Sequence, residues 1–172
     1  MLSSVFLPKS GEIEMKLDNL AIQTGVMRKG MTIRDFFIEA VRCDVPGLPY
    51  EDEQGRIVGR ISLRDVYKRM AVTDNLLSFA DVIGDQTDSL DLPPMKVMET
   101  LALPVETYLI KKAPSASPRS SIVKALVIME ANDSGYIFVI DNGKYNGVVT
   151  RRIIAKRMLE CVMNHKPESS AA

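Results

Sequence analysis

The sequence repeats itself, and this feature constrains the fold more than any other. Residues 55–70 and 143–158 align at a separation of 88 residues, and both copies share glycines, an arginine and a final Lys-Arg-Met at matching positions. Residues 32–44 align with residues 121–133 at a separation of 89 residues. The separation differs by one because the hairpin turn is one residue longer in the first copy. Turns tolerate such length changes. The chain therefore contains two copies of one supersecondary unit, expected to share a continuous core.

Each copy predicts the order helix, strand, strand, helix, preceded by an extended segment. Thr32 and Ser121 are good N-cap residues, and the residues after them carry apolar side chains at helical spacing. Two short apolar runs follow in each copy, joined by a turn with Asp and Gly, which is typical of a β-hairpin. The predicted helices cover 32–44, 63 to about 71, 121–133 and 151 to about 164. The predicted strands cover 48–51, 57–62, 136–140 and 145–149.

These patterns predict an α/β (α+β) protein built from two units. The expected divisions are an N-terminal extension at 1–15, a first unit at 16–72, an acidic connector at 73–97, a second unit at 98–164 and a disordered tail at 165–172. The connector is rich in aspartate and turn residues, and we expect a short helix around 75–83 followed by a loop. The tail has no apolar side chain that could anchor it.

Charge and composition exclude several functions. Lys plus Arg and Asp plus Glu both total 22, so no broad cationic field is available to hold nucleic acid or an anionic membrane. No stretch is apolar enough for a membrane span or a signal peptide. Cys43 and Cys161 lie far apart and the one histidine is His165, which is poor material for a metal site or a nucleophile with its base. We expect a cytoplasmic protein that is not an enzyme and holds no metal.

The run LPYEDEQGRIVGRISLRD, at 48–65, resembles the second half of a cystathionine-beta-synthase (CBS) domain. That pattern has an apolar residue and Pro, a strand, an Asp/Gly turn, a second strand ending in Ser or Thr, and an Asp three residues later. The paired arrangement resembles a Bateman module over about residues 16–164. The first copy fits the pattern more closely, because the second has Phe138 where the first has Pro49, and Ile153 where the first has Asp65.

The resemblance implies a fold and a function. CBS units pack in pairs about a pseudo-twofold axis, with clefts between them that bind adenosine-containing ligands such as AMP, ADP, ATP or S-adenosylmethionine. The module has no chemistry of its own, often forms homodimers, and regulates a partner. It therefore implies a ligand sensor that signals to an effector protein. The resemblance leaves open which ligand is bound, which partner is regulated and whether regulation activates or inhibits.

The residues themselves fit an adenosine site around Ser62 and Asp65. Ser62 starts a helix whose first backbone N–H groups are free, and Asp65 can accept hydrogen bonds from two ribose hydroxyls. Gly47, Leu48 and Pro49 are expected to form a wall for the base. The alternative is that Ser62 and Asp65 form an acidic variant of the capping box, which needs no ligand.

The arginines after each hydroxyl cap are the candidates for phosphate. The resemblance implies that Arg151, with Arg152 as second choice, reaches across the pseudo-twofold axis to phosphate in the Asp65 cleft. Thr150 and Arg64 would then belong to a second, degenerate cleft, because no acid follows Thr150. The alternative for the arginines is that they are solvated residues of the first helical turn. The alternative for the whole protein is a dimerisation or scaffold module that binds no nucleotide.

Overall fold

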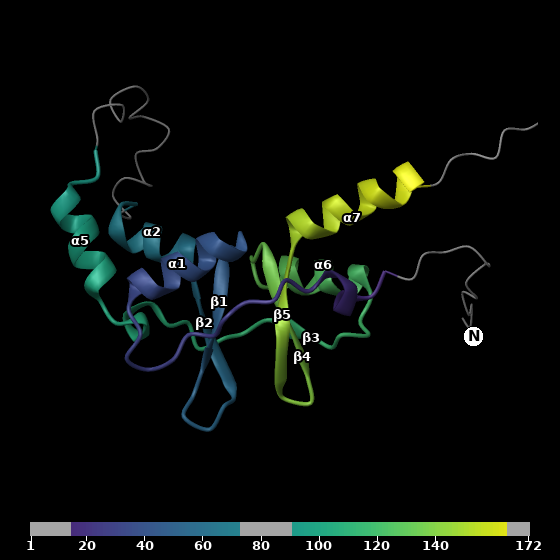
Figure 1. The fold of residues 1–172 in the computed structure, drawn as a ribbon, viewed down its shortest axis with the longest axis horizontal. Coiled ribbons are helices and arrows are strands. Elements are labelled where there is room, and N and C mark those ends of the chain that lie inside the picture. The colour runs from purple at the N-terminus through teal and green to yellow at the C-terminus, as the bar shows by residue number, and fades with distance from the viewer. Residues whose placement is uncertain (1–14, 73–90, 165–172) are drawn as a thin grey trace, which may run out of the picture.

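The computed structural model describes residues 15–72 and 91–164, and these form a mixed α/β fold. Two β-hairpins stand next to each other with their turns at one end of the molecule, and most of the helices lie towards the other end (Figure 1). The predicted helix around 75–83 and the predicted tail at 165–172 lie outside the described residues.

The elements predicted for the first repeat are confirmed. They are α1 (Ile33–Cys43), β1 (Gly47–Glu51), β2 (Ile57–Ser62) and α2 (Leu63–Met70). Thr32 caps α1 in a capping box: its hydroxyl accepts a hydrogen bond from the Asp35 backbone N–H, and the Asp35 carboxylate accepts one from the Thr32 backbone N–H. Asp44 ends the helix in the left-handed conformation, with a φ of 53°.

The second repeat has the same architecture. Its elements are β3 (Ser115–Ala116), α6 (Ile122–Ala131), β4 (Tyr136–Asp141), β5 (Lys144–Thr150) and α7 (Arg151–Asn164). Ser121 caps α6, as predicted, and Asp133 takes the left-handed conformation that Asp44 takes in the first repeat. The two hairpins also share a register, since Gly47 lies opposite Ser62 and Tyr136 lies opposite Thr150.

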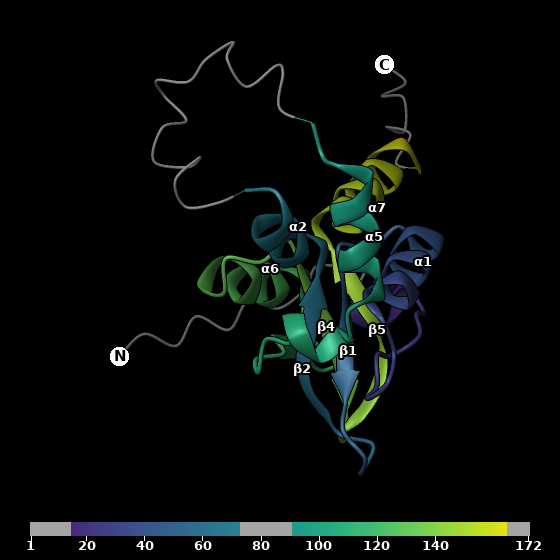
Figure 2. The same cartoon turned by 90° about the vertical axis from the view of Figure 1, so that its left-hand side faces the viewer.

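Four of the described elements were not among those predicted: η1 (Leu17–Leu20), α5 (Pro94–Ala102), η3 (Val105–Tyr108) and the two-residue strand β3. Helix α5 begins inside the segment predicted to be a loop. Pro94 is its first residue, a position where proline is favourable because its missing N–H has no helical partner to lose. Figure 2 shows α5 next to α1 and α2, which it contacts.

The repeats exchange the segments that precede them. Ile22, before the first repeat, pairs with Val148 of β5 through backbone hydrogen bonds of 2.8 and 2.9 Å. Ile110, before the second repeat, pairs in the same way with Arg60 of β2 through two bonds of 2.9 Å. Each hairpin therefore gains a neighbour from the segment that precedes the other repeat.

This exchange explains a glycine shared by both copies. A Cβ atom on Gly59 would lie 2.5 Å from the carbonyl oxygen of Ile110, and one on Gly147 would lie 2.6 Å from that of Ile22. Neither backbone oxygen can retreat without breaking the pairing described above. Only glycine admits the crossing segment this close.

Buried side chains form two clusters, and each includes residues from both halves of the chain. The first contains Phe36, Leu48 and Ile61 together with Val105 of η3 and Phe138 of β4. The second is built on α6 and its hairpin, and includes Leu17 and Leu20 of η1. The division into units at 16–72 and 98–164 therefore stays a prediction, because neither cluster follows those boundaries. In residues 15–72 and 91–164, every helix falls short of the length and apolar character needed to cross a membrane.

Glu39 on α1 gives the fold a dependence on pH. Its carboxylate accepts hydrogen bonds from the Arg42 guanidinium, at 2.7 Å, and from the Gly25 backbone N–H, at 2.5 Å. The Arg42 bonds, joined by that from Gly25, outweigh burial and lower the pKa of Glu39 from 4.5 to about 2. Because the folded pKa is depressed, the stabilisation is present above about pH 4.5 and is lost as the pH falls towards 2.

We therefore expect Glu39→Gln to flatten the loss of stability between pH 7 and pH 3. The measurement is the urea midpoint of unfolding at both pH values. Glu99→Gln is the control, since Glu99 is exposed on α5. If both variants lose as much stability on acidification as the original protein, Glu39 does not contribute in this way.

Candidate ligand pockets between the two repeats

Two pockets lie between the repeats and are related by the same pseudosymmetry as the hairpins. Each combines the start of the second helix of one repeat with the turn before the hairpin of the other. The Asp65 pocket has a volume of about 210 Å³ and joins Arg60, Ser62, Arg64 and Asp65 to the turn at 133–136. The Thr150 pocket has a volume of about 430 Å³ and joins Thr150, Arg151 and Arg152 to residues 44–46, with Ala40 and Val41.

Ser62 and Asp65 meet at the start of α2, as predicted. The Ser62 hydroxyl accepts a hydrogen bond from the Asp65 backbone N–H at 3.2 Å and donates one to the Asp65 carboxylate. Ser62 is buried, so this cap lies at the base of the pocket. The Ser62 hydroxyl caps α2, as the capping alternative requires, but the Asp65 carboxylate bonds to that hydroxyl, whereas the Asp35 carboxylate of α1 also bonds to the backbone N–H of its cap residue.

One arginine spans each pocket. Arg64 donates to the Asp133 carboxylate at 2.7 Å and to the Asp133 carbonyl at 3.1 Å, and so links α2 to the turn of the second repeat. Arg152 forms the matching ion pair with Asp44 across the Thr150 pocket. Both aspartates are the left-handed residues that end α1 and follow α6. These pairs are solvent-exposed and contribute orientation more than stability.

The arginines line the opposite pockets to those predicted, which were the Asp65 pocket for Arg151 and Arg152 and the Thr150 pocket for Arg64. Arg151 and Arg152 line the Thr150 pocket, and Arg151 forms an ion pair with Glu130 at 2.7 Å. Arg64 lines the Asp65 pocket. The reason is local: each arginine lies in the first turn of its helix, beside the hydroxyl that caps the same helix, and its side chain remains at that pocket.

Gly47, Leu48 and Pro49 are not brought to either pocket. All three are buried in β1, and Leu48 belongs to the first buried cluster. Gly47 faces Tyr136, whose hydroxyl oxygen would lie 2.1 Å from a Cβ atom at that position. Two residues do line both pockets: Pro46, just before β1, and Gly135, just before β4.

Sequence reasoning missed Arg60 and Tyr136 as pocket residues. Arg60 precedes Ser62 by two residues on β2, and alternation along a strand places the two side chains on one face. Its guanidinium lies 5.8 Å from the centroid of the Tyr136 ring. Tyr136 is buried, and this burial raises the pKa of its hydroxyl far above the ordinary value, although the positive charge of Arg60 opposes the shift.

The chemistry available in these pockets is that of binding. The Asp65 pocket offers a carboxylate, hydroxyl groups and guanidinium groups, and the Thr150 pocket adds an apolar wall. Within residues 15–72 and 91–164, no three histidine, cysteine or acidic side chains gather as a metal site would require. A third hollow, of about 550 Å³, lies by the first hairpin turn, where the charges of Arg28 and Lys29 are already paired with glutamates.

Comparison with known proteins identifies the class. The family model described as the CBS domain matches residues 105–160. This range falls in the second repeat, although the sequence pattern looked closer in the first. No curated protein matches the chain closely enough to be reported as a relative. Residues 105–160 match the CBS domain model, and the chain has the mixed α/β fold of a CBS domain pair.

Solved structures with this fold cover most of the chain. A CBS-domain-containing protein from Agrobacterium tumefaciens is similar with a TM-score of 0.60 and 15% identity, over 88% of this chain and 98% of that one. One from Bacillus anthracis has a TM-score of 0.58 and 18% identity, over 86% and 94%. The CBS domain pair of protein MJ0100, in complex with 5′-methylthioadenosine and S-adenosyl-L-methionine, has a TM-score of 0.59 and 15% identity, over 86% and 98%.

Proposed function

We propose that this protein is a non-catalytic regulatory module that binds an adenosine-containing ligand in the Asp65 pocket and signals to a partner protein. The observation that carries the proposal is the convergence of Ser62, Asp65 and two arginines at the interface between the repeats. The expected ligands are AMP, ADP or ATP, with S-adenosylmethionine also in the class. Support comes from the similar CBS pair that was solved with two adenosine compounds.

The Asp65 carboxylate is the proposed ribose acceptor. Vicinal hydroxyls donate to a carboxylate in the way that the Ser62 hydroxyl donates now, so the ligand replaces one internal hydrogen bond by two of its own. The start of α2 adds the positive end of the helix dipole, although the backbone N–H groups of Leu63 and Asp65 already donate to Pro46 and Ser62. The Thr150 pocket is the proposed degenerate site, because Ile153 stands where a second carboxylate would be needed.

The helices provide the proposed route to a partner. A ligand bound between the repeats contacts α2 of one and the turn before β4 of the other, so it favours one relative position of the two. Val123 and Val127 on α6 and Leu159 on α7 are between 61% and 70% exposed. We propose these faces for homodimer contact and for the effector protein, both of which would sense that position.

A ligand-independent scaffold is the second candidate, and two observations favour it. Ser62 and Asp65 already satisfy one another as a cap. The Asp65 pocket, at about 210 Å³, is also smaller than the roughly 300–1,000 Å³ of common ligand pockets. A whole nucleotide must therefore extend out of the pocket or displace a side chain that lines it.

Thermal unfolding against AMP, ADP, ATP and S-adenosylmethionine separates the two candidates. A ligand at 100 times its Kd is expected to stabilise the folded protein by about 2.7 kcal/mol. Asp65→Ala should abolish this shift, while its cost without ligand is about 1 kcal/mol or less, the cost of a weakened cap.

Asp91→Ala is the matched control for Asp65→Ala, because Asp91 is exposed and outside both pockets. It should keep the full ligand shift. If no ligand shifts the original protein, the scaffold candidate replaces the sensor. If a ligand shifts Asp65→Ala as much as the original protein, the ligand binds elsewhere.

A further inference from the structure

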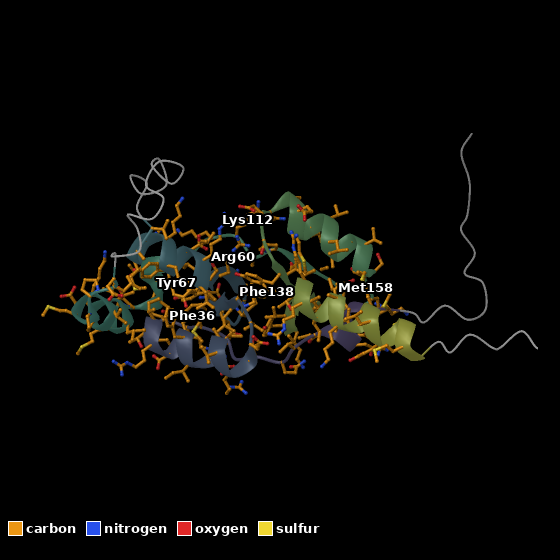
Figure 3. All side chains as sticks on the ribbon, turned by 90° about the horizontal axis from the view of Figure 1, so that it is seen from above. Phe36, Arg60, Tyr67, Lys112, Phe138 and Met158 are labelled. Carbon is orange, nitrogen blue, oxygen red and sulfur yellow. The ribbon has the colours of Figure 1, made fainter. Side chains whose placement is uncertain are left out.

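The Asp65 pocket contains a guanidinium group that lacks an acceptor. Figure 3 shows Arg60 where the two repeats meet, between Tyr67 and Phe138 in that view. Its Nε and one of its terminal nitrogens are buried and have no hydrogen-bond partner. Its described contact is with the face of the Tyr136 ring. Arg64, in the same pocket, differs because it is paired with Asp133.

The Tyr136 hydroxyl is a second buried donor without an acceptor. Tyr136 is 4% exposed, it lines the pocket, and its oxygen has no hydrogen-bond partner in the described part of the chain. Buried donors are almost always satisfied, because leaving one unpaired costs about 1–3 kcal/mol and leaving a charged one unpaired costs more. Two such donors beside one pocket indicate that an acceptor belongs there.

The acceptor that fits both donors is an oxyanion. A phosphate or carboxylate group accepts several hydrogen bonds, and it supplies the negative charge that a buried guanidinium needs. Asp65 does not fill this role, since the hydrogen bond it accepts from a side chain is that of Ser62. Ribose hydroxyls at Asp65 and an oxyanion at Arg60 use different groups of the pocket, so one ligand can satisfy both.

We infer that the ligand of the Asp65 pocket carries a phosphate or carboxylate group, and that Arg60 and Tyr136 hold this group and select the ligand over nucleosides that lack one. This inference rests on the function proposed above and specifies the ligand further. It also assigns the guanidinium contact to Arg60, in the repeat that carries Asp65, and the hydroxyl contact to Tyr136 of the other repeat, whereas the resemblance implied Arg151. Phosphate and carboxylate share this chemistry, and the test distinguishes them.

Isothermal titration calorimetry with AMP, S-adenosylmethionine and adenosine is the direct test. The original protein should bind AMP, if the oxyanion is a phosphate, or S-adenosylmethionine, if it is a carboxylate, at least tenfold more tightly than adenosine. Arg60→Gln should remove most of that preference while changing the affinity for adenosine by less than about twofold. Tyr136→Phe should reduce the preference by a smaller factor.

Arg56→Gln is the matched control, since Arg56 lies next to the same strand and pairs with Asp52 away from the pocket. It should bind all three compounds like the original protein. A second measurement needs no ligand: the Tm of Arg60→Gln should equal or exceed that of the original protein, because the variant removes a partly buried charge that forms no ion pair among the described residues. A clearly lower Tm would mean that Arg60 has a structural role, and would overturn the inference.

The remaining outcomes separate this inference from the proposed function. Adenosine binding as tightly as both AMP and S-adenosylmethionine, or an equal loss of affinity for all three compounds in Arg60→Gln, overturns the inference and leaves an adenosine sensor. If none of the three compounds binds, the proposed function fails, and titration with inorganic phosphate then decides the anion site. A Tm shift by phosphate that Arg60→Gln lacks would support an anion site, and no shift would overturn it.

Discussion

Replacing Phe138 by alanine is expected to lower the free energy of unfolding by about 3–5 kcal/mol, the usual cost of removing a buried aromatic side chain. Phe138 lies on β4 of the second repeat but packs in the first buried cluster with Phe36, Leu48 and Ile61, and it is fully buried there. Its ring meets the rings of Tyr136 and Tyr145 edge to face, with centroids 5.5 and 6.0 Å apart. The cavity therefore opens where the two repeats join. Urea unfolding followed by circular dichroism measures the change.

Two variants bracket this result. Phe138→Leu keeps most of the volume and should cost less than Phe138→Ala, because the cavity it leaves is smaller. Val127→Ala removes an apolar side chain that is 61% exposed on α6 and should change stability little. If Phe138→Ala costs no more than Val127→Ala, the side chain does not join the repeats as described.

Gly147→Ala is expected to destabilise the protein by about 2–6 kcal/mol, because two penalties act on one residue. The new Cβ would lie 2.6 Å from the Ile22 carbonyl oxygen, and overpacking of this kind costs about 1–3 kcal/mol. The backbone also has a φ of +143°, a conformation whose strain costs about 1–3 kcal/mol for other residues. The free energy of unfolding, measured by urea denaturation, gives the total.

Other glycines of the chain separate the two penalties. Gly59→Ala has the close contact, with Ile110, without the positive φ, and Gly143→Ala has a φ of +82° with open space around it. Each should cost less than Gly147→Ala. Gly135→Ala has neither problem and serves as the control. A cost for Gly147→Ala as small as that for Gly135→Ala would contradict the close crossing of the segment at Ile22.

The sequence predicts the elements whose signals are local. Thr32, Ser62 and Ser121 cap helices where the pattern places them, and both hairpins follow from their Asp/Gly turns and apolar runs. Helix α5 was not predicted, because it begins at the second of two consecutive prolines in an acidic stretch, and this pattern is also typical of a loop. The exchange at Ile22 and Ile110 leaves no local signal, since each partner lies in the other repeat.

In the Asp65 pocket, too, local contacts could be predicted from the sequence and contacts between the repeats could not. Ser62 and Asp65 are three residues apart, so their contact could be predicted from the sequence. The placement of Arg64 and Arg151 depends on which pocket each helix start faces, and that is a property of the packed pair. Arg60 was within reach of sequence reasoning, because alternation along β2 puts it beside Ser62. The sequence could not show that buried nitrogens of its guanidinium group have no hydrogen-bond acceptor, because this depends on the packing of the two repeats.

The exchange of segments also sets the order in which a newly made chain can finish folding. The Gln23 side chain donates to the Asn146 carbonyl at 2.5 Å, across 123 residues of sequence. Helix α1 and the first hairpin can form as soon as they leave the ribosome, but the backbone around Ile22 has no partner until β5 has been made. Contacts this far apart in sequence form slowly. The start of the fold is therefore one of its last parts to be secured during biosynthesis.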